Sequence, residues 1–396
     1  MRIVFDFEAT GAQSNHAHPY DKRNVACNVG FYNLDTKIKT IIKLEYDEAP
    51  YGEALKEIQT ILDGCTILIG FNLKYDLAWL SRYGLILPST CRVFDCQLAF
   101  FILTAQKNSY PGLDQVAEYY SLEKKLDIVK EEYWNKGLDT NQVPYDVLCE
   151  YLEQDLVVTA QCYRNLQIDI SLSDNKMQQL LKMSMLDLVV LQDIEKNGLL
   201  LNKEKSLLKG DRIQERLDKI DSWLRRVFKA DWFNPSSGDH LSVFLYGGTL
   251  MLDGKEEYLF AYKDGRTALK TRNTKVPFTV KGLFIPLEKS ELAKEGFYAT
   301  NEGTLKSILY KAKGEYATIL EVILNRAKLE KLRGTYYYGL PKRIDEMGWF
   351  DNIIHSNFNQ CVAQSGRLSS TKPNVQNVAD EVLEVFISRF KPKESI

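Results

Sequence analysis

Apolar and polar residues follow two periods in the first 170 residues, and each period predicts a different kind of element. Short apolar runs predict strands, the first three as an antiparallel start to a sheet, at residues 2–7, 25–33, 38–44 and 66–71. Helical spacing of apolar residues predicts helices at residues 51–62, 72–83, 93–103, 113–120 and 145–166. Strands followed by interleaved helices are typical of an α/β fold, so we expect a mixed sheet with flanking helices that ends near residue 170.

The rest of the chain shows mainly helical spacing. A helix capped by Ser173 or Asp174 should end at Asn197 and Gly198, because Asn-Gly is a frequent signal at a helix C-terminus. Two more helical patterns follow, at residues 204–228 and 304–343. Between them, an alternating, glycine-rich stretch at about residues 246–300 predicts a small β insertion. We therefore expect three parts, at residues 1–170, 171–345 and 346–396.

Charge differs between the two halves of the chain. Residues 1–170 hold 16 Lys and Arg against 24 Asp and Glu, whereas the other residues hold 35 against 29. An acidic half suits hard cations, and a basic half suits a polyanion. The seven cysteines form no CxxC pair and only four histidines are present, so we expect no zinc site and a reducing compartment. We see no signal peptide and no 18-residue apolar run, which predicts a cytoplasmic protein without a membrane span.

Acidic residues stand where three apolar elements end. Asp6 and Glu8 are two positions apart in a strand and therefore point to the same face. Asp76 follows the change from a strand to a helix, and Tyr151 and Asp155 share one face of a helix because they are four positions apart. Each of these patterns alone is common at protein surfaces. Their order along one α/β pattern predicts a single acidic site.

Carboxylates gathered in one place repel one another unless cations neutralise them. Oxygen ligands favour Mg²⁺ or Mn²⁺, and two such ions about 4 Å apart can drive phosphodiester hydrolysis without a histidine base. We therefore expect two Mg²⁺ (or Mn²⁺) as cofactors and hydrolysis of a phosphodiester bond. Tyr151 would hold the attacking water in line.

Three segments resemble the motifs of a known nuclease family. FDFEAT, GFNLKYDLAWL and YLEQDLVVTAQ are similar to the three motifs of the proofreading 3′→5′ exonuclease domain of family A DNA polymerases, which has a ribonuclease H-like fold. The resemblance implies that Asp6, Glu8 and Asp155 bind a first metal ion. Asp6, together with Asp76 acting through water, would hold a second. It also implies that Asn72 and the backbone at Thr10 contact the terminal nucleotides.

The resemblance continues into the basic half. FNPSSGDHLSVFLYGG and LNRAKLEKLRGTYYYGL look like parts of the thumb of this polymerase family, and the β insertion looks more like that of phage replicases. IHSNFNQCVAQSGRLSSTKPNVQNV is close to the family's T-G-R-L-S-S-x-x-P-N-x-Q-N signature, with Ser365 in place of threonine. The resemblance implies that basic side chains of the thumb-like region contact DNA phosphates, namely Arg326, Lys331 and Arg333. It also implies that residues of the signature contact the primer–template duplex, namely Arg367, Ser369, Asn374, Gln376 and Asn377.

The polymerase catalytic motifs of this family do not occur in the sequence. The D-Y-S-x-x-E motif, the nucleotide-binding helix and the H-D-E motif are missing, so residues 346–396 resemble only the beginning of a palm. We therefore expect a split, phage-like replicase, acting in the host cytoplasm, whose palm and fingers lie on a separate partner chain. A processivity factor is a further candidate partner. A truncation made by engineering would have the same sequence.

Three functions remain open at this point. The first is DNA proofreading on single-stranded and primer–template DNA, which the motifs favour. The second is a DNA-binding scaffold with little activity of its own. The third is an RNA exonuclease of the ribonuclease D type, against which the thumb-like region and GRLSSTKPNVQN argue.

Overall fold

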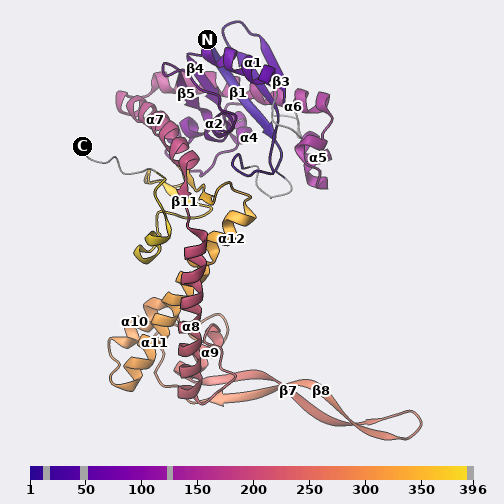
Figure 1. The fold of residues 1–396 in the computed structure, drawn as a ribbon, viewed down its shortest axis with the longest axis vertical. Coiled ribbons are helices and arrows are strands. Elements are labelled where there is room, and N and C mark those ends of the chain that lie inside the picture. The colour runs from indigo at the N-terminus through magenta and orange to yellow at the C-terminus, as the bar shows by residue number, and fades with distance from the viewer. Residues whose placement is uncertain (12–17, 45–51, 123–127, 390–396) are drawn as a thin grey trace. The chain divides into compact units, whose positions relative to one another are not determined.

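The structure is a computed structural model, and it describes residues 1–11, 18–44, 52–122 and 128–389. The chain forms two compact units, Met1–Ser206 with Gly339–Ile396 and Leu207–Tyr338, each with its own apolar core (Figure 1). The three-part division at residues 170 and 345 stays a prediction, because compact units group residues by packing and do not define family domains.

A five-stranded mixed sheet forms the centre of the first unit. Its strands are β1 (Arg2–Ala9), β2 (Ala26–Asn33), β3 (Lys39–Lys43), β4 (Ile67–Gly70) and β5 (Arg92–Asp95), in the spatial order β3-β2-β1-β4-β5. β1, β2 and β3 pair antiparallel, as predicted, whereas β4 and β5 run parallel to β1. The α/β fold class with a mixed sheet is thereby confirmed.

Seven α-helices of the first unit precede residue 198 in the described part of the chain. They are α1 (Gly52–Asp63), α2 (Leu73–Arg82), α3 (Cys96–Leu103), α4 (Leu113–Tyr119), α5 (Ile128–Glu132), α6 (Tyr145–Leu172) and α7 (Asn175–Asn197). The helix predicted over residues 93–103 was partly wrong, because residues 92–95 form β5. β5 has the sequence RVFD, and its two apolar residues fit both periods, so that only pairing with β4 makes it a strand. Tyr51, in the predicted helix 51–62, lies outside the described residues.

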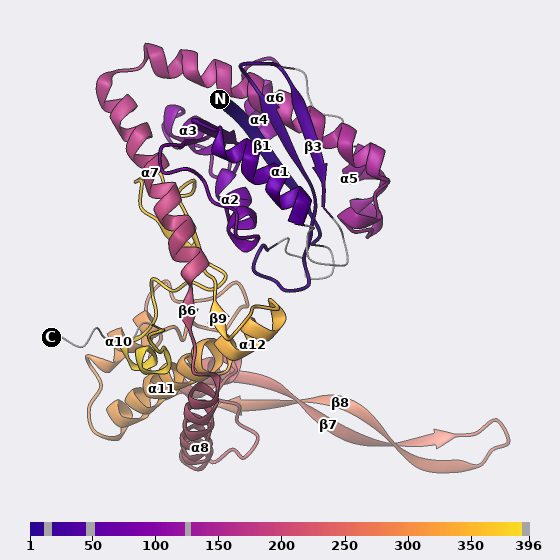
Figure 2. The ribbon, with the colours of Figure 1, turned by 45° about the horizontal axis from the view of Figure 1, so that its top comes forward.

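The two faces of β1 pack against different helices. Phe7 lies with its ring 6.4 Å from that of Trp79 in α2, whereas α6 packs along β1 and β2 (Figure 2). Gly30 of β2 pairs with Asp6, and a Cβ atom at Gly30 would lie 2.7 Å from Leu156 Cδ1 of α6. The missing side chain therefore lets α6 approach the face of β1 that carries Asp6.

Helix α7 begins and ends at the predicted signals. Of the two candidate caps it is Asp174 that accepts a hydrogen bond from the Met177 backbone N, at 2.8 Å. Gly198 follows the helix with a φ of 56°, and a Cβ atom there would lie 2.6 Å from the Ile354 carbonyl oxygen. The chain then enters β6 (Leu199–Leu200), which pairs with β9 (Ile353–Ile354). A second short pair, β10 (Asn357–Asn359) with β11 (Ser369–Thr371), follows in the same unit.

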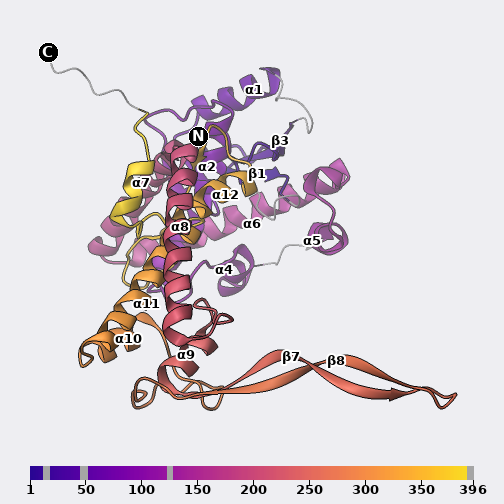
Figure 3. The same ribbon diagram turned by 60° about the horizontal axis from the view of Figure 1, so that its bottom comes forward.

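The second unit is mainly helical. Its elements are most of α8 (Lys203–Phe228), α9 (Gly238–Tyr246), β7 (Gly248–Ala261), β8 (Thr267–Val280), α10 (Glu302–Leu309), α11 (Glu315–Lys331) and the π-helical segment η4 (Leu332–Tyr337). α12 (Gly339–Glu346) belongs to the first unit. The β insertion is one long two-stranded hairpin that leaves α9 (Figure 3). The helical stretch predicted at 304–343 is interrupted before Gly314, whose φ is 60°. None of the described helices has the length and apolar character needed to cross a bilayer.

Candidate active site

Three carboxylates from two elements meet beside the sheet. Asp6 and Glu8 lie on β1 and Asp155 lies on α6, and one ligand oxygen of each is within 4.8 Å of the others. Glu8 and Asp155 are buried, and Asp6 is half-buried. Asp6 and Glu8 point to one face because they are two positions apart in a strand, and α6 brings Asp155 to that face. Like charges this close favour a bound cation.

Asp76 approaches the same strand from α2. Its carboxylate is buried, and Oδ1 accepts a hydrogen bond of 3.2 Å from the Phe7 backbone N. Among the described residues, the 4.8 Å group does not include it. Burial, and then the negative charge of Asp6, raise the pKa of Asp76 well above its usual range. A cation beside Asp6 would offset that charge, so the oxygen donors and the raised pKa both fit a hard divalent ion such as Mg²⁺ or Mn²⁺.

Tyr151 lies one helical turn before Asp155 on α6. The side chain is buried, and its ring meets the ring of Trp134 edge to face at 5.7 Å. Tyr151 also packs with Cys27, Leu148 and other residues in a small apolar cluster. Trp134 escaped the sequence analysis because its short 3₁₀ segment, Trp134–Lys136, shows no periodicity. The ring contact holds the tyrosine in one orientation beside the carboxylates.

Asn72 stands at the N-terminus of α2 in a left-handed conformation, with φ 57° and ψ 42°. Its side chain is exposed, makes no capping hydrogen bond and lines a cavity of about 490 Å³. Lys74, Tyr75 and Asn359 line the same cavity. The amide of Asn72 is therefore directed to a space that a polar ligand can enter.

Asp95, which the sequence analysis did not single out, holds the N-termini of α2 and α3 in place. Its buried carboxylate accepts hydrogen bonds from the backbone N of Leu73 at 2.9 Å and of Gln97 at 2.8 Å. Longer bonds come from the backbone N of Asn72 and Leu98. One carboxylate thus caps both α2 and α3. The available signal was an aspartate placed between the apolar residues VF and a helical pattern.

Replacing Asp95 by alanine should lower the free energy of unfolding of the first unit by about 2–3 kcal/mol, because buried backbone N–H groups at two helix starts lose their acceptor. Urea denaturation of both proteins measures this difference. Asp95→Asn keeps one acceptor oxygen and should lose less. Equal stability of Asp95→Ala and the parent chain would contradict this role for Asp95.

Comparison with known proteins agrees with this geometry. Residues 3–171 match the family model for a 3′-5′ exonuclease, and residues 273–394 match the model for DNA polymerase family A. The chain carries an exonuclease domain and part of a family A DNA polymerase domain. Its carboxylate site lies wholly within the residues that match the exonuclease model.

Individual relatives of this chain are bacterial DNA polymerases I. That of Treponema pallidum is 26% identical over 317 residues, which cover 80% of this chain and 27% of the relative. That of Streptococcus pneumoniae serotype 4 is 24% identical over 377 residues, covering 95% and 35%. This chain therefore spans about a third or less of these relatives. The predicted likeness to phage replicases stays a prediction.

A solved structure has a similar fold. The polymerase domain of Pol1 from M. smegmatis, in complex with primer–template DNA and dNTP, matches with a TM-score of 0.65. It shares 16% sequence identity, and the match covers 98% of this chain and 55% of that one. The likeness at this identity concerns the fold alone.

The signature residues of the chain are mostly exposed. Arg367, Asn374, Gln376 and Asn377 have exposed side chains. Ser369 lies on β11, and its hydroxyl is buried without a hydrogen-bond partner among the residues that the structure describes. The four residues are thus accessible from solvent, whereas the Ser369 hydroxyl faces the interior.

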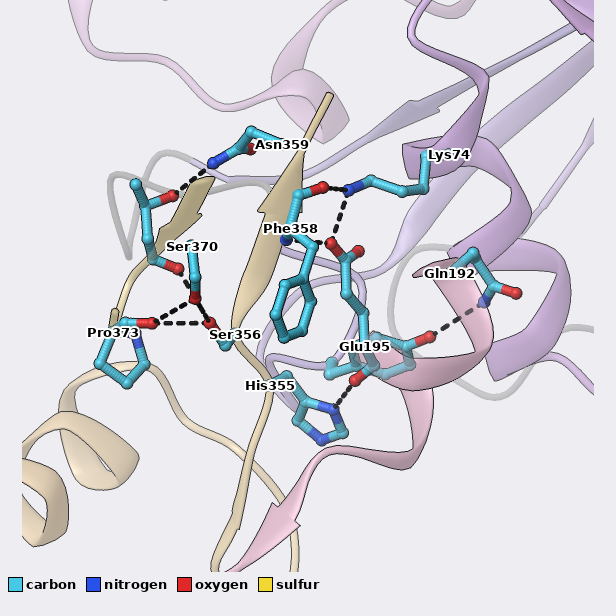
Figure 4. Close-up of polar contacts among 11 residues, drawn as sticks. Lys74, Gln192, Glu195, His355, Ser356, Phe358, Asn359, Ser370 and Pro373 are labelled. Carbon is cyan, nitrogen blue, oxygen red and sulfur yellow. Dashed lines mark hydrogen bonds and ion pairs between the residues drawn. The ribbon is translucent and has the colours of Figure 1, made fainter. Parts of the chain in front are cut away.

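A polar bridge holds the β10–β11 pair to α2 and α7 within the first unit (Figure 4). Lys74 Nζ lies 2.5 Å from Glu195 Oε1, and it donates to the Phe358 carbonyl oxygen. Glu195 Oε1 in turn accepts from the Phe358 backbone N. Burial raises the pKa of Glu195, and the Lys74 ammonium opposes that shift. The bridge joins the exonuclease-like sheet and its helices to the segment with the polymerase signature.

The predicted phosphate-binding residues of the second unit differ in exposure. Lys331 is exposed, and Arg333 is half-buried with its guanidinium 6.0 Å from the Tyr338 ring centroid. Arg326 is buried, and its guanidinium pairs with Asp221 at 2.5 Å and Glu330 at 2.6 Å. Its charge is thus neutralised inside the unit. A contact between Arg326 and a DNA phosphate stays a prediction.

Thr10 is also engaged within the fold. Its backbone N donates to the Val25 carbonyl oxygen at 2.9 Å, and its hydroxyl accepts from the Val25 backbone N at 2.9 Å. Both groups close the end of the β1–β2 pair. Neither group is therefore offered to a nucleotide in this structure.

Proposed function

We propose that this chain hydrolyses the last phosphodiester bond at a DNA 3′ end and releases nucleoside 5′-monophosphates. The observation that carries this proposal is the convergence of Asp6, Glu8 and Asp155 within 4.8 Å on an exonuclease-type sheet. Two Mg²⁺ or Mn²⁺ would be held by these three carboxylates, with Asp76 acting through water. When bound, such ions supply a nucleophilic hydroxide and stabilise the leaving oxygen.

The chain's own residues would position the other reactants. Asp6, Glu8 and Asp155 supply the oxygen ligands, and the Tyr151 hydroxyl orients the attacking water on the side of α6. Asn72 would hold the terminal nucleotide from the N-terminus of α2. The oxygen of water bonds to phosphorus, the P–O3′ bond breaks, and the shortened strand keeps a 3′-hydroxyl.

The setting would be proofreading in a bacterial or phage-infected cytoplasm. A frayed 3′ end would run along the cavity lined by Asn72, Lys74 and Asn359, and exposed Arg367 and Asn374 would grip the duplex. DNA synthesis would need the polymerase carboxylates, which residues 1–396 do not contain. We propose that other residues supply them, in the same polypeptide or in a partner chain, and that a processivity factor is a further candidate partner.

A degradation assay with 5′-labelled oligonucleotides tests this function. With Mg²⁺, the chain should shorten single-stranded DNA stepwise from the 3′ end, and a mismatched primer end faster than a paired one. EDTA should stop the reaction. A preference for RNA of the same sequence would favour a ribonuclease D-like enzyme instead. If the DNA kept its full length after prolonged incubation, the proposal would be wrong.

A DNA-binding scaffold is the second candidate function, because four signature side chains are exposed on the first unit. Such a protein would bind primer–template DNA and leave its length unchanged. The slope of affinity against salt would report the phosphate contacts. Binding with Mg²⁺-dependent trimming favours the nuclease, and binding without trimming favours the scaffold.

Replacing Tyr151 by phenylalanine should lower kcat for 3′ trimming roughly tenfold with little change in KM, because only the orientation of the attacking water is lost. Single-turnover assays on labelled DNA measure the rate. Tyr145→Phe is the matched control, since Tyr145 lies in the first turn of the same helix, where the Lys43 ammonium sits 4.9 Å from its ring centroid. Equal losses in the two variants would contradict a specific role for the Tyr151 hydroxyl.

A further inference from the structure

One buried amide beside the carboxylates has no partner. Asn28 of β2 is fully buried, and neither its Nδ2 nor its Oδ1 makes a hydrogen bond to any residue that the structure describes. An amide without partners in a protein interior is costly, and native proteins rarely keep one without a reason. A leucine has a similar size and would avoid that cost. The amide at this position therefore calls for partners that it does not contact in this state.

The strand register places Asn28 directly opposite Glu8. Asn28 pairs with Glu8 across the antiparallel β1–β2 pair, and the next pair joins Ala9 to Ala26, so that Cys27 is an extra residue in β2. Such a bulge re-aims the side chains around it, and bulges are frequent next to active sites. Opposed residues in an antiparallel pair point to the same face. The Asn28 amide and the Glu8 carboxylate therefore share one face of the sheet.

That face is the one covered by α6. Gly30, two residues along β2 from Asn28, lies under Leu152 and Leu156 of α6. Lys43, which pairs with Asn28 on the other side, holds its ammonium over the ring of Tyr145 in α6. The neighbours of Asn28 along and across the sheet thus both reach α6. Asn28 faces the layer between sheet and helix in which Asp155 and Tyr151 also lie.

We propose that Asn28 is a positioning residue for the nuclease reaction. Its Nδ2 donates a hydrogen bond to the Glu8 carboxylate when divalent cations are bound, and its Oδ1 accepts from a water molecule of the loaded site. The hydrogen bond orients the Glu8 oxygen toward the cation, as partners behind metal ligands do in other metal sites. This role rests on the proposed function, because it requires Glu8 to be a metal ligand.

Binding of Mn²⁺ without DNA provides the test, with Asn28→Leu and Asn28→Ala as a pair of variants. Leucine keeps the volume and removes the amide, whereas alanine removes both. We expect both variants to bind Mn²⁺ about tenfold more weakly than the parent chain in calorimetric titrations. The Mg²⁺ concentration for half-maximal DNA trimming should rise by a similar factor. The melting temperature of metal-free Asn28→Leu should equal or exceed that of the parent chain, and that of Asn28→Ala should be lower.

Three outcomes decide the matter. Weaker Mn²⁺ binding by Asn28→Leu at undiminished metal-free stability supports the positioning role, because a merely structural amide would change stability and leave metal affinity alone. Parent-like Mn²⁺ affinity in Asn28→Leu overturns the role of Asn28 and leaves the nuclease proposal standing. If the parent chain neither binds Mn²⁺ nor trims DNA, the proposed function itself fails, and the role of Asn28 fails with it.

Discussion

Replacing Asp6 and Glu8 together by alanine should lower kcat for removal of a 3′ nucleotide on the order of 10⁴-fold. The pair supplies two of the three carboxylates that converge within 4.8 Å, and Asp155 alone cannot hold the cations. Stability without metal should not fall, because the substitution removes like charges from a crowded place. Affinity for DNA in the presence of Ca²⁺ should change far less than the rate.

Single-turnover trimming of 5′-labelled single-stranded DNA measures the effect over four orders of magnitude. Glu53→Ala with Glu57→Ala is the matched control, because it removes two exposed acids four positions apart on α1. The control should trim at the parent rate. Trimming by the Asp6–Glu8 variant within tenfold of the parent would show that the nuclease lies elsewhere in the chain or in a contaminant.

The stability of the metal-free parent chain relative to its Asp76→Asn variant should fall as the pH rises above about 4. Burial and the charge of Asp6 raise the pKa of Asp76 well above 3.8 in the folded state. Above pH 4 the Asp76 carboxyl is deprotonated in the unfolded chain but still protonated in the folded chain. The free energy of unfolding therefore decreases as the pH rises toward the pKa of the folded state. Asp95 and Glu195, whose pKa values burial also raises, act in the same direction. His355, whose pKa burial lowers to about 4, acts in the opposite direction. All three remain in the variant, so that the difference between the two proteins reports Asp76.

Divalent cations should reverse this slope. Because a cation and a proton compete for the carboxylates, Mg²⁺ should raise the melting temperature more at pH 8 than at pH 5. The Asp76→Asn variant should gain less from Mg²⁺ and trim DNA roughly 10- to 100-fold more slowly than the parent. Melting curves across the pH range, with EDTA and with Mg²⁺, measure both effects. Parallel pH profiles for the two proteins would contradict the raised pKa of Asp76.

The secondary structure was predictable where the local signal was strong. Helix α7 begins after Asp174 and ends before Gly198, as the capping chemistry of these residues predicts. The apolar runs correctly predicted β1, β2 and β3. β5 was missed because its two apolar residues, Val93 and Phe94, are too few to show a period. The break before Gly314 was missed because the helical pattern continues on both sides of it.

Individual side chains were harder to predict than elements. Arg326 lies on a basic helix and was expected at DNA, yet its guanidinium meets Asp221, 105 residues earlier in the chain. Thr10 closes a strand pair with Val25. Asp95 caps two helices, one of which begins 22 residues before it. In each case the partner is distant in sequence, so no local pattern reveals it.

The sequence by itself determined which carboxylates share a face, because spacings of two in a strand and four in a helix set the direction of a side chain. Asp6 with Glu8, and Tyr151 with Asp155, follow from that geometry alone. Only the tertiary structure decided that these two faces meet, since α6 must pack against β2 at Gly30. Packing of α2 against β1 buries Asp76, and the register of the β1–β2 pair places Asn28 opposite Glu8. Burial and strand register depend on contacts between distant residues, and those contacts form only when the whole unit folds.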